Sequence, residues 1–125
     1  MNKALKDLLS IGRENKEVKV AGVKWKLHTL NAEEQLAATD STGDYDNLTR
    51  VMALKIAILS RALESVNGEP LGNVGETRDA LNKMQFSIVN KLFDEYDKMI
   101  TNQEKVLTDL DNESEETEEK VVEQK

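Results

Sequence analysis

Few residues of the 125-residue sequence have a type and spacing suited to catalysis or metal binding. His28 is the only histidine, and there is no cysteine. Zinc sites and Ser/His/Asp groups need several such residues at defined positions, so the sequence predicts no catalytic, metal-binding or cofactor-binding residue. We expect His28 to face solvent where a strand ends.

A cluster of oxygen-bearing side chains invites comparison with a calcium loop: Asp40, Asp44, Asp46 and Asn47. An EF-hand loop that starts at Asp40 would need glycine at its sixth position and glutamate at its twelfth. Those positions hold Tyr45 and Val51. The cluster is therefore interpreted as a set of turn and helix-cap residues.

Two further patterns resemble sites without completing one. The stretch GNVGETR at 72–78 has glycines but neither the lysine nor the preceding strand of a phosphate-binding loop, and we interpret it as a connector. Glu33 and Glu34 are paired carboxylates, but they stand at a predicted helix start, where the helix dipole favours acids. The sequence thus predicts that the protein is not an enzyme.

The strongest strand signal lies at about 17–28. Apolar residues alternate there with charged or small ones, at Val18, Val20, Val23, Trp25 and Leu27, and Ala21-Gly22 can form a tight turn. A two-stranded hairpin is marginal alone, so we expect it to pack on helices.

Apolar spacing predicts helices elsewhere. A short helix is expected at 4–11, and another from Asn31, with Glu34 completing a capping box. A third begins at Asp46 or Asn47 and carries apolar residues on most of its faces as far as Val66, so it should be the central buried helix. Asn67-Gly68 and then Pro70 are expected to end it.

A short helix around 80–84 and a long one from Phe86 to Ile100 complete the prediction. The fold class is α+β, mostly α-helical, with a small hairpin packed on a helical bundle. Residues 1–110 form one compact domain by length. Residues 111–125 hold seven of the 24 acidic residues and two of the 17 basic ones, and predict an acidic disordered tail.

Charge and hydropathy narrow the partners. A net charge of −7 offers no basic surplus for nucleic acid or anionic membranes. No apolar run is long enough for a bilayer span or a signal peptide, and the absence of cysteine fits a reducing compartment, so we expect a cytosolic protein. A homo-oligomer is left open.

Two segments are candidates for contact with a protein partner. The hairpin face at Val23, Trp25 and Leu27 could bind a partner at an open strand edge, although the lysines around it could equally guard that edge against pairing. The acidic tail could keep the chain soluble, or occupy a binding groove until a partner arrives. Its candidate residues are Glu115, Glu116, Glu118 and Glu119.

Three segments carry a resemblance to a known family: VKWKLHTLNAEEQL, ALKIAILSRALESVNGEPL and RDALNKMQFSIVNKLFDEYDKM. Over residues 17–100 the chain resembles small tail-assembly chaperones and related baseplate or hub assembly proteins of tailed bacteriophages. The matching positions are Trp25, Leu27, Leu30, Glu33, Glu34, Ser65, Asn67, Gly68, Pro70, Leu71, Leu92 and Tyr96.

The resemblance implies a non-enzymatic role in the cytoplasm of the host cell. Such chaperones bind the tape-measure protein, keep it soluble and recruit tail-tube subunits. The alternatives are a structural tail or baseplate-hub component that stays in the virion tail, and a small regulatory or antitoxin-like binding module.

Overall fold

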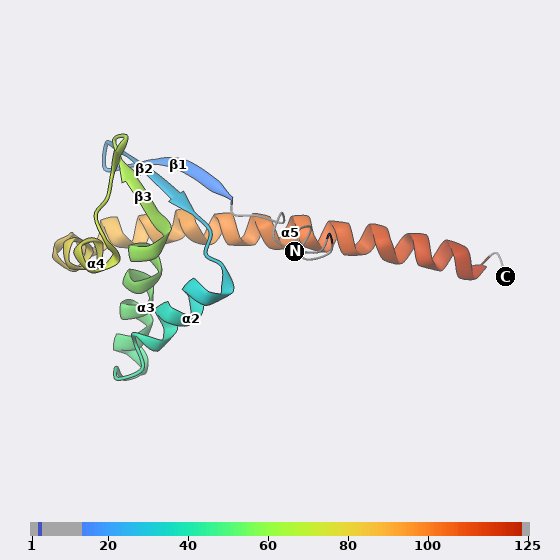
Figure 1. The fold of residues 1–125 in the computed structure, drawn as a ribbon, viewed down its shortest axis with the longest axis horizontal. Coiled ribbons are helices and arrows are strands. Elements are labelled where there is room, and N and C mark those ends of the chain that lie inside the picture. The colour runs from blue at the N-terminus through green and yellow to red at the C-terminus, as the bar shows by residue number, and fades with distance from the viewer. Residues whose placement is uncertain (1–2, 4–13, 124–125) are drawn as a thin grey trace.

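The computed structural model describes Lys3 and residues 14–123, with side chains beyond Asp109 described only at Asn112. Its described part contains one four-stranded antiparallel sheet and four helices, which confirms an α+β, mostly helical fold (Figure 1). The helix expected at 4–11 lies outside the described residues.

The predicted hairpin is present, as β1 (Asn15–Val20) and β2 (Val23–His28). Val20 pairs with Val23, so two residues form the turn. Ala21 and Gly22 have φ of 55° and 77°, as a type I′ turn requires. Such a turn matches the right-handed twist of the strands and fixes their register.

Helices α2 (Ala32–Asp40) and α3 (Asn47–Ala62) begin where the caps predict. The Asn31 side chain accepts a hydrogen bond from the Glu34 backbone N–H, and the Glu34 carboxylate accepts one from the Asn31 N–H. Asp46 caps α3 by accepting from the Thr49 N–H at 2.9 Å. Each cap satisfies helix N–H groups that would otherwise lack a partner.

The predicted end of the central helix is wrong. α3 ends at Ala62, and the chain continues as β3 (Leu63–Val66) and β4 (Glu69–Pro70), so the sheet has the order β1-β2-β3-β4. Asn67 and Gly68 form the turn of this second hairpin, with φ of 50° and 83°. An Asn-Gly pair suits a helix C-cap and a type I′ turn alike, because both need positive φ.

β3 lies against the inner strand of the first hairpin. Trp25 pairs with Val66, and Asn67 joins the two hairpins: its N–H donates to the Lys24 carbonyl at 2.7 Å, and its side-chain oxygen accepts from the Lys24 N–H at 3.0 Å. β2 is therefore an inner strand of the sheet, and β1 is at one edge.

The last two helices are α4 (Val74–Lys83), which Asn73 caps, and α5 (Phe86–Glu123). α5 packs on α3 and β1, then continues as a long rod beyond the body (Figure 1). The core lies where the sheet, α3 and α5 meet, around the fully buried side chains of Leu27, Leu59 and Leu92.

The C-terminal segment differs from the sequence expectation. Residues 111–123, predicted to be a disordered tail, continue α5 as helix. Glutamate is a good helix former, so an acidic composition that disfavours a packed core does not oppose a helix. The division into a domain at 1–110 and a separate tail at 111–125 stays a prediction.

Candidate protein-binding surface

In the part of the chain that the structure describes, no group of three or more acidic or histidine side chains could hold a metal ion. His28 is buried, not solvent-facing as predicted, and its Nδ1 lies 2.9 Å from the Thr29 carbonyl oxygen. From the cluster of oxygen-bearing side chains at 40–47, Asp46 caps a helix. Hydrogen bonds from Thr49, the backbone N–H first, hold the pKa of Asp46 below its usual 3.8. The interpretation of GNVGETR as a connector is wrong for most of its length, because Asn73 caps α4 and residues 74–78 are the first residues of that helix.

The hairpin face does not form the open surface that the sequence suggests. Leu27 is fully buried, Trp25 is nearly so and Val23 is half-buried. The Trp25 indole N–H donates to the Val20 carbonyl at 3.2 Å, which satisfies its polar atom inside the chain. β3 occupies the β2 edge at which a partner strand was expected.

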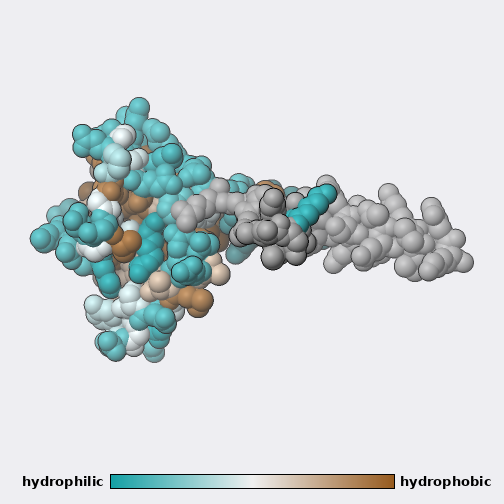
Figure 2. Space-filling view, viewed as in Figure 1, coloured by the Kyte–Doolittle hydropathy of each residue, from teal (hydrophilic) through white to brown (hydrophobic). Residues whose placement is uncertain are grey.

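One side of Trp25 borders an apolar hollow of about 190 Å³ between the sheet and α4. Its other walls come from β3, the loop after β4, and α4: Leu63, Val66, Leu71, Thr77, Ala80, Leu81 and Met84. Figure 2 shows apolar surface in this region between β3 and α4. The hollow is large enough for one apolar side chain of a partner.

A longer apolar surface follows one face of α3. Residues 48, 52, 55, 59 and 62 recur at spacings of four and three, so they share a stripe along the helix. Leu59 and Ala62 are fully buried, Lys55 is half-buried, and Met52 and Leu48 are exposed by 46% and 84%. The stripe is covered at its C-terminal end and uncovered at its N-terminal end.

The cover over the stripe is α5. The part of the stripe that α5 covers ends at Lys55. The Lys55 ammonium group donates to the side chain of Asn90 at 3.2 Å and lies 5.4 Å from the centre of the Phe93 ring, and both of these residues belong to α5. Figure 1 shows α5 crossing α3 near one end, with the other end of α3 and α2 projecting away from the sheet. Beyond this crossing the stripe is exposed, by 46% at Met52 and by 84% at Leu48.

The uncovered region, which we call the arm, consists of α2, the loop 41–46 and the first two turns of α3. Its interior is small, with Ala38 and Thr42 fully buried where α2 lies against α3. Its surface carries large apolar side chains: Leu36, Tyr45, Leu48, Val51 and Met52. Figure 2 shows apolar surface over α2. Exposed apolar groups in such density are typical of an interaction surface.

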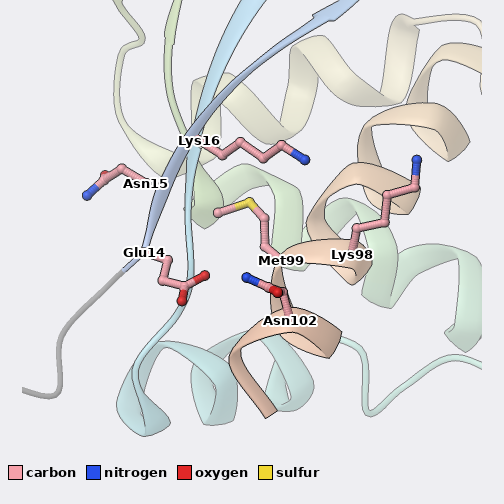
Figure 3. A pocket seen from close by; sticks show the side chains of 6 residues that line it. All are labelled: Glu14, Asn15, Lys16, Lys98, Met99 and Asn102. Carbon is pink, nitrogen blue, oxygen red and sulfur yellow. The ribbon is translucent and has the colours of Figure 1, made fainter. Parts of the chain in front are cut away.

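A second hollow, of about 430 Å³, lies between the start of β1 and α5 (Figure 3). Met99 and Asn102 extend from α5 toward β1, and Lys16 extends back toward α5. Lys16 and Lys98 both form ion pairs with Glu95, at 3.4 and 3.2 Å, and the Lys98 hydrogen bond first and Lys16 next hold the pKa of Glu95 below its usual value. Because Lys16 of β1 and Lys98 of α5 both pair with Glu95, the side chains at this hollow serve to hold β1 against α5.

The acidic candidates Glu115, Glu116, Glu118 and Glu119 lie on the backbone of the distal part of α5, and their side chains are outside the described residues. Their contact with a partner stays a prediction. Sequence reasoning missed the arm surface, because it assigned the whole of α3 to the core.

Comparison of the chain with protein-family models, curated proteins and solved structures finds no match. Within the described residues, no helix has the length and apolar character to cross a membrane.

Proposed function

We propose that the chain is a tail-assembly chaperone of a tailed bacteriophage, which binds the tape-measure protein or tail-tube subunits in the host cytoplasm and catalyses no reaction. The observation that carries the proposal is the uncovered half of the α3 stripe. The segments that resemble the chaperone family supply the class of client.

The arm suits a helical client. Leu48, Val51 and Met52 lie at i, i+3 and i+4, which is the spacing that an amphipathic helix presents to another helix. Full burial of such a side chain from a fully exposed state contributes about 1.5–3 kcal/mol. Leu48 is 84% exposed and gains most of this, whereas Val51 and Met52, exposed by 57% and 46%, gain about half of it. Much of that gain is offset by the loss of translational and rotational freedom on association, so three anchors give the reversible binding that a chaperone needs.

This assignment moves the client site from the hairpin face to the arm. Leu27 and most of Trp25 already contact the chain's own core, and a partner would have to unfold the sheet to reach Leu27. The hollow beside Trp25 offers one secondary contact for a client side chain. The net charge of −7 favours solubility of the complex with an aggregation-prone client.

The test is co-expression of a tagged copy with each long helical protein encoded beside it, followed by affinity capture. We expect a soluble complex with a tape-measure-like chain that precipitates when it is expressed alone. If a well-folded, monodisperse preparation captures none of these proteins, the chaperone proposal fails.

The second candidate is a structural tail or baseplate-hub component, which the same exposed arm would serve by permanent burial in the particle. Mass spectrometry of purified virions separates the two. A chaperone is absent from the finished particle, whereas a structural component is present at a fixed ratio to the tube subunits.

A further inference from the structure

The two edges of the sheet differ in what they offer to another strand. β4 has two residues, one of which is Pro70, and proline at an edge blocks pairing. β1 has six residues and no proline. Natural sheets seldom leave such an edge without protection, so the groups that β1 presents outward decide what can pair with it.

The register of the first hairpin identifies these groups. Val20 and Val23 close the two-residue turn and so form a hydrogen-bonded pair, after which such pairs alternate along the strands. Glu14 follows the same alternation, since its carbonyl accepts from the Thr29 N–H at 3.0 Å. The backbone groups of the residues between, Asn15, Glu17 and Lys19, therefore point away from β2.

The charges on this edge are incompletely paired. Lys19 lies directly opposite Lys24 across the hairpin, and like charges in that position are unfavourable. Glu17 lies opposite Lys26, which forms its ion pair with Glu64 at 3.5 Å. Lys19, Lys24 and Glu17 have no ion pair in the described part of the chain. An acid placed on the open side of Lys19 would relieve the repulsion.

We propose that β1 is a self-association edge, at which a second copy adds its own β1 antiparallel across a two-fold axis at Val18. In this register Glu17 of each copy lies opposite Lys19 of the other, in two hydrogen-bonded pairs that each exchange two backbone hydrogen bonds. The two sheets then form one continuous sheet, and both lysines at position 19 gain an acidic neighbour.

The charges on β1 favour a second copy of the chain as the partner, and they favour one register of pairing. A two-fold axis at Glu17 places Glu17 opposite itself, and an axis at Lys19 places Lys19 opposite itself, so both neighbouring registers are repulsive. Only the axis at Val18 makes the edge complementary to its own copy. This association does not depend on the arm or on the proposed function.

The first test is the concentration dependence of the mass in solution, by light scattering or sedimentation. We expect a species of twice the 14.1-kDa chain mass. Glu17→Lys and Lys19→Glu should each weaken the dimer on the order of ten-fold, because two attractive pairs become repulsive. The combined exchange, Glu17→Lys with Lys19→Glu, should restore it.

Matched controls are Glu104→Lys and Lys105→Glu, the same charge changes at adjacent exposed positions of α5, which should leave the dimer unchanged. Lys19→Glu also separates weaker dimerisation from loss of folding. It removes the repulsion with Lys24, so it should stabilise the monomer while it weakens the dimer. A general loss of folding would instead lower both the stability of the monomer and the affinity of the dimer.

The second test is disulfide cross-linking, which is simple because the chain has no cysteine. In the proposed register two Val18 residues form a non-hydrogen-bonded pair with Cα atoms about 4.5 Å apart, within disulfide range. Val18→Cys should cross-link on oxidation and Glu17→Cys should not. If Val18→Cys fails to fold, the charge variants at positions 17 and 19 still test the proposal.

A monomer at every soluble concentration would overturn the proposal. So would a dimer that ignores the charge changes at 17 and 19, or one that cross-links through position 17.

Discussion

The two halves of α3 carry apolar residues along one face, on either side of Lys55, and have opposite surroundings. From Lys55 to Ala62 the stripe lies under α5 and the sheet, whereas from Leu48 to Met52 it lies open on the arm. Both halves have the residue types of a protein core. An apolar pattern therefore predicts that a surface will be covered, and it does not specify whether the same chain provides the cover.

The two ends of α3 also differ in how they are fixed. At the arm end Asp46 caps an exposed helix start, and at the core end the chain passes directly into β3, with Leu63 buried. The core end is held by tertiary packing and sheet hydrogen bonds, and the arm end by local interactions. Local interactions contribute less, so the arm should be the weaker part of the structure.

The largest expected effect compares one substitution in the two halves. Leu59→Ala removes a fully buried side chain and should lower the free energy of unfolding by about 2–5 kcal/mol. Leu48→Ala removes an 84% exposed side chain and should change it by less than about 0.5 kcal/mol. Urea denaturation measures both, and equal losses would show that the arm is packed as tightly as the core.

A smaller effect compares the turns near the two ends of α3. Gly68 has φ of +83°, where a side chain is strained even though a Cβ would meet no atom within 4 Å. Gly68→Ala should cost about 1–2 kcal/mol. Gly43, in the arm loop, has no positive φ, and a Cβ there would meet only the Asp40 carbonyl at 3.5 Å. Gly43→Ala should therefore be neutral or slightly stabilising.

Denaturation midpoints of the two alanine variants provide this measurement. A loss at Gly43 equal to that at Gly68 would contradict the assignment of the second hairpin turn, because only Gly68 is placed where L-residues are strained.

The smallest effect is the pH dependence of the arm cap. The pKa of Asp46 is lowered in the folded chain because its carboxylate accepts hydrogen bonds from Thr49. The ionised group thus stabilises the fold above its ordinary pKa of 3.8, and this contribution is lost as the pH falls through the lower, folded value. Asp46→Asn keeps a capping oxygen without the charge.

The measurement is the stability difference between wild type and Asp46→Asn as the pH is lowered. We expect wild type to lose an advantage on acidification that the variant never has. A difference independent of pH would show that the Asp46 charge plays no part in the cap.

Local chemistry made much of the fold predictable. The Asn31–Glu34 capping box, the Asp46 cap and the Ala21-Gly22 turn each depend on interactions within a few residues, and all are present. Leu63 to Val66 could not be placed in the same way. Their apolar residues continue the helix pattern, and only pairing with β2, distant in the sequence, selects the strand.

The candidate surface was less predictable than the fold for the same reason. Trp25 and Leu27 alternate as a half-buried strand should, but the element that covers them comes from later in the chain. Leu48 and Met52 look like core, and their exposure depends on where α5 crosses α3. Whether a residue is buried depends on how the elements assemble, and the periodicity within one element does not carry that information.

The central claim is that the exposed apolar residues in the arm half of α3 bind a partner and contribute little to folding. The most direct test is the pair Leu48→Ser and Val51→Ser in one variant, measured for both its denaturation midpoint and its capture of the long helical client. Val74→Ser, at a 41% exposed apolar position on α4, is the control. We predict an unchanged midpoint and lost capture for the arm variant, with capture retained by the control. A folded arm variant that still captures the client, or one that unfolds, would contradict the account.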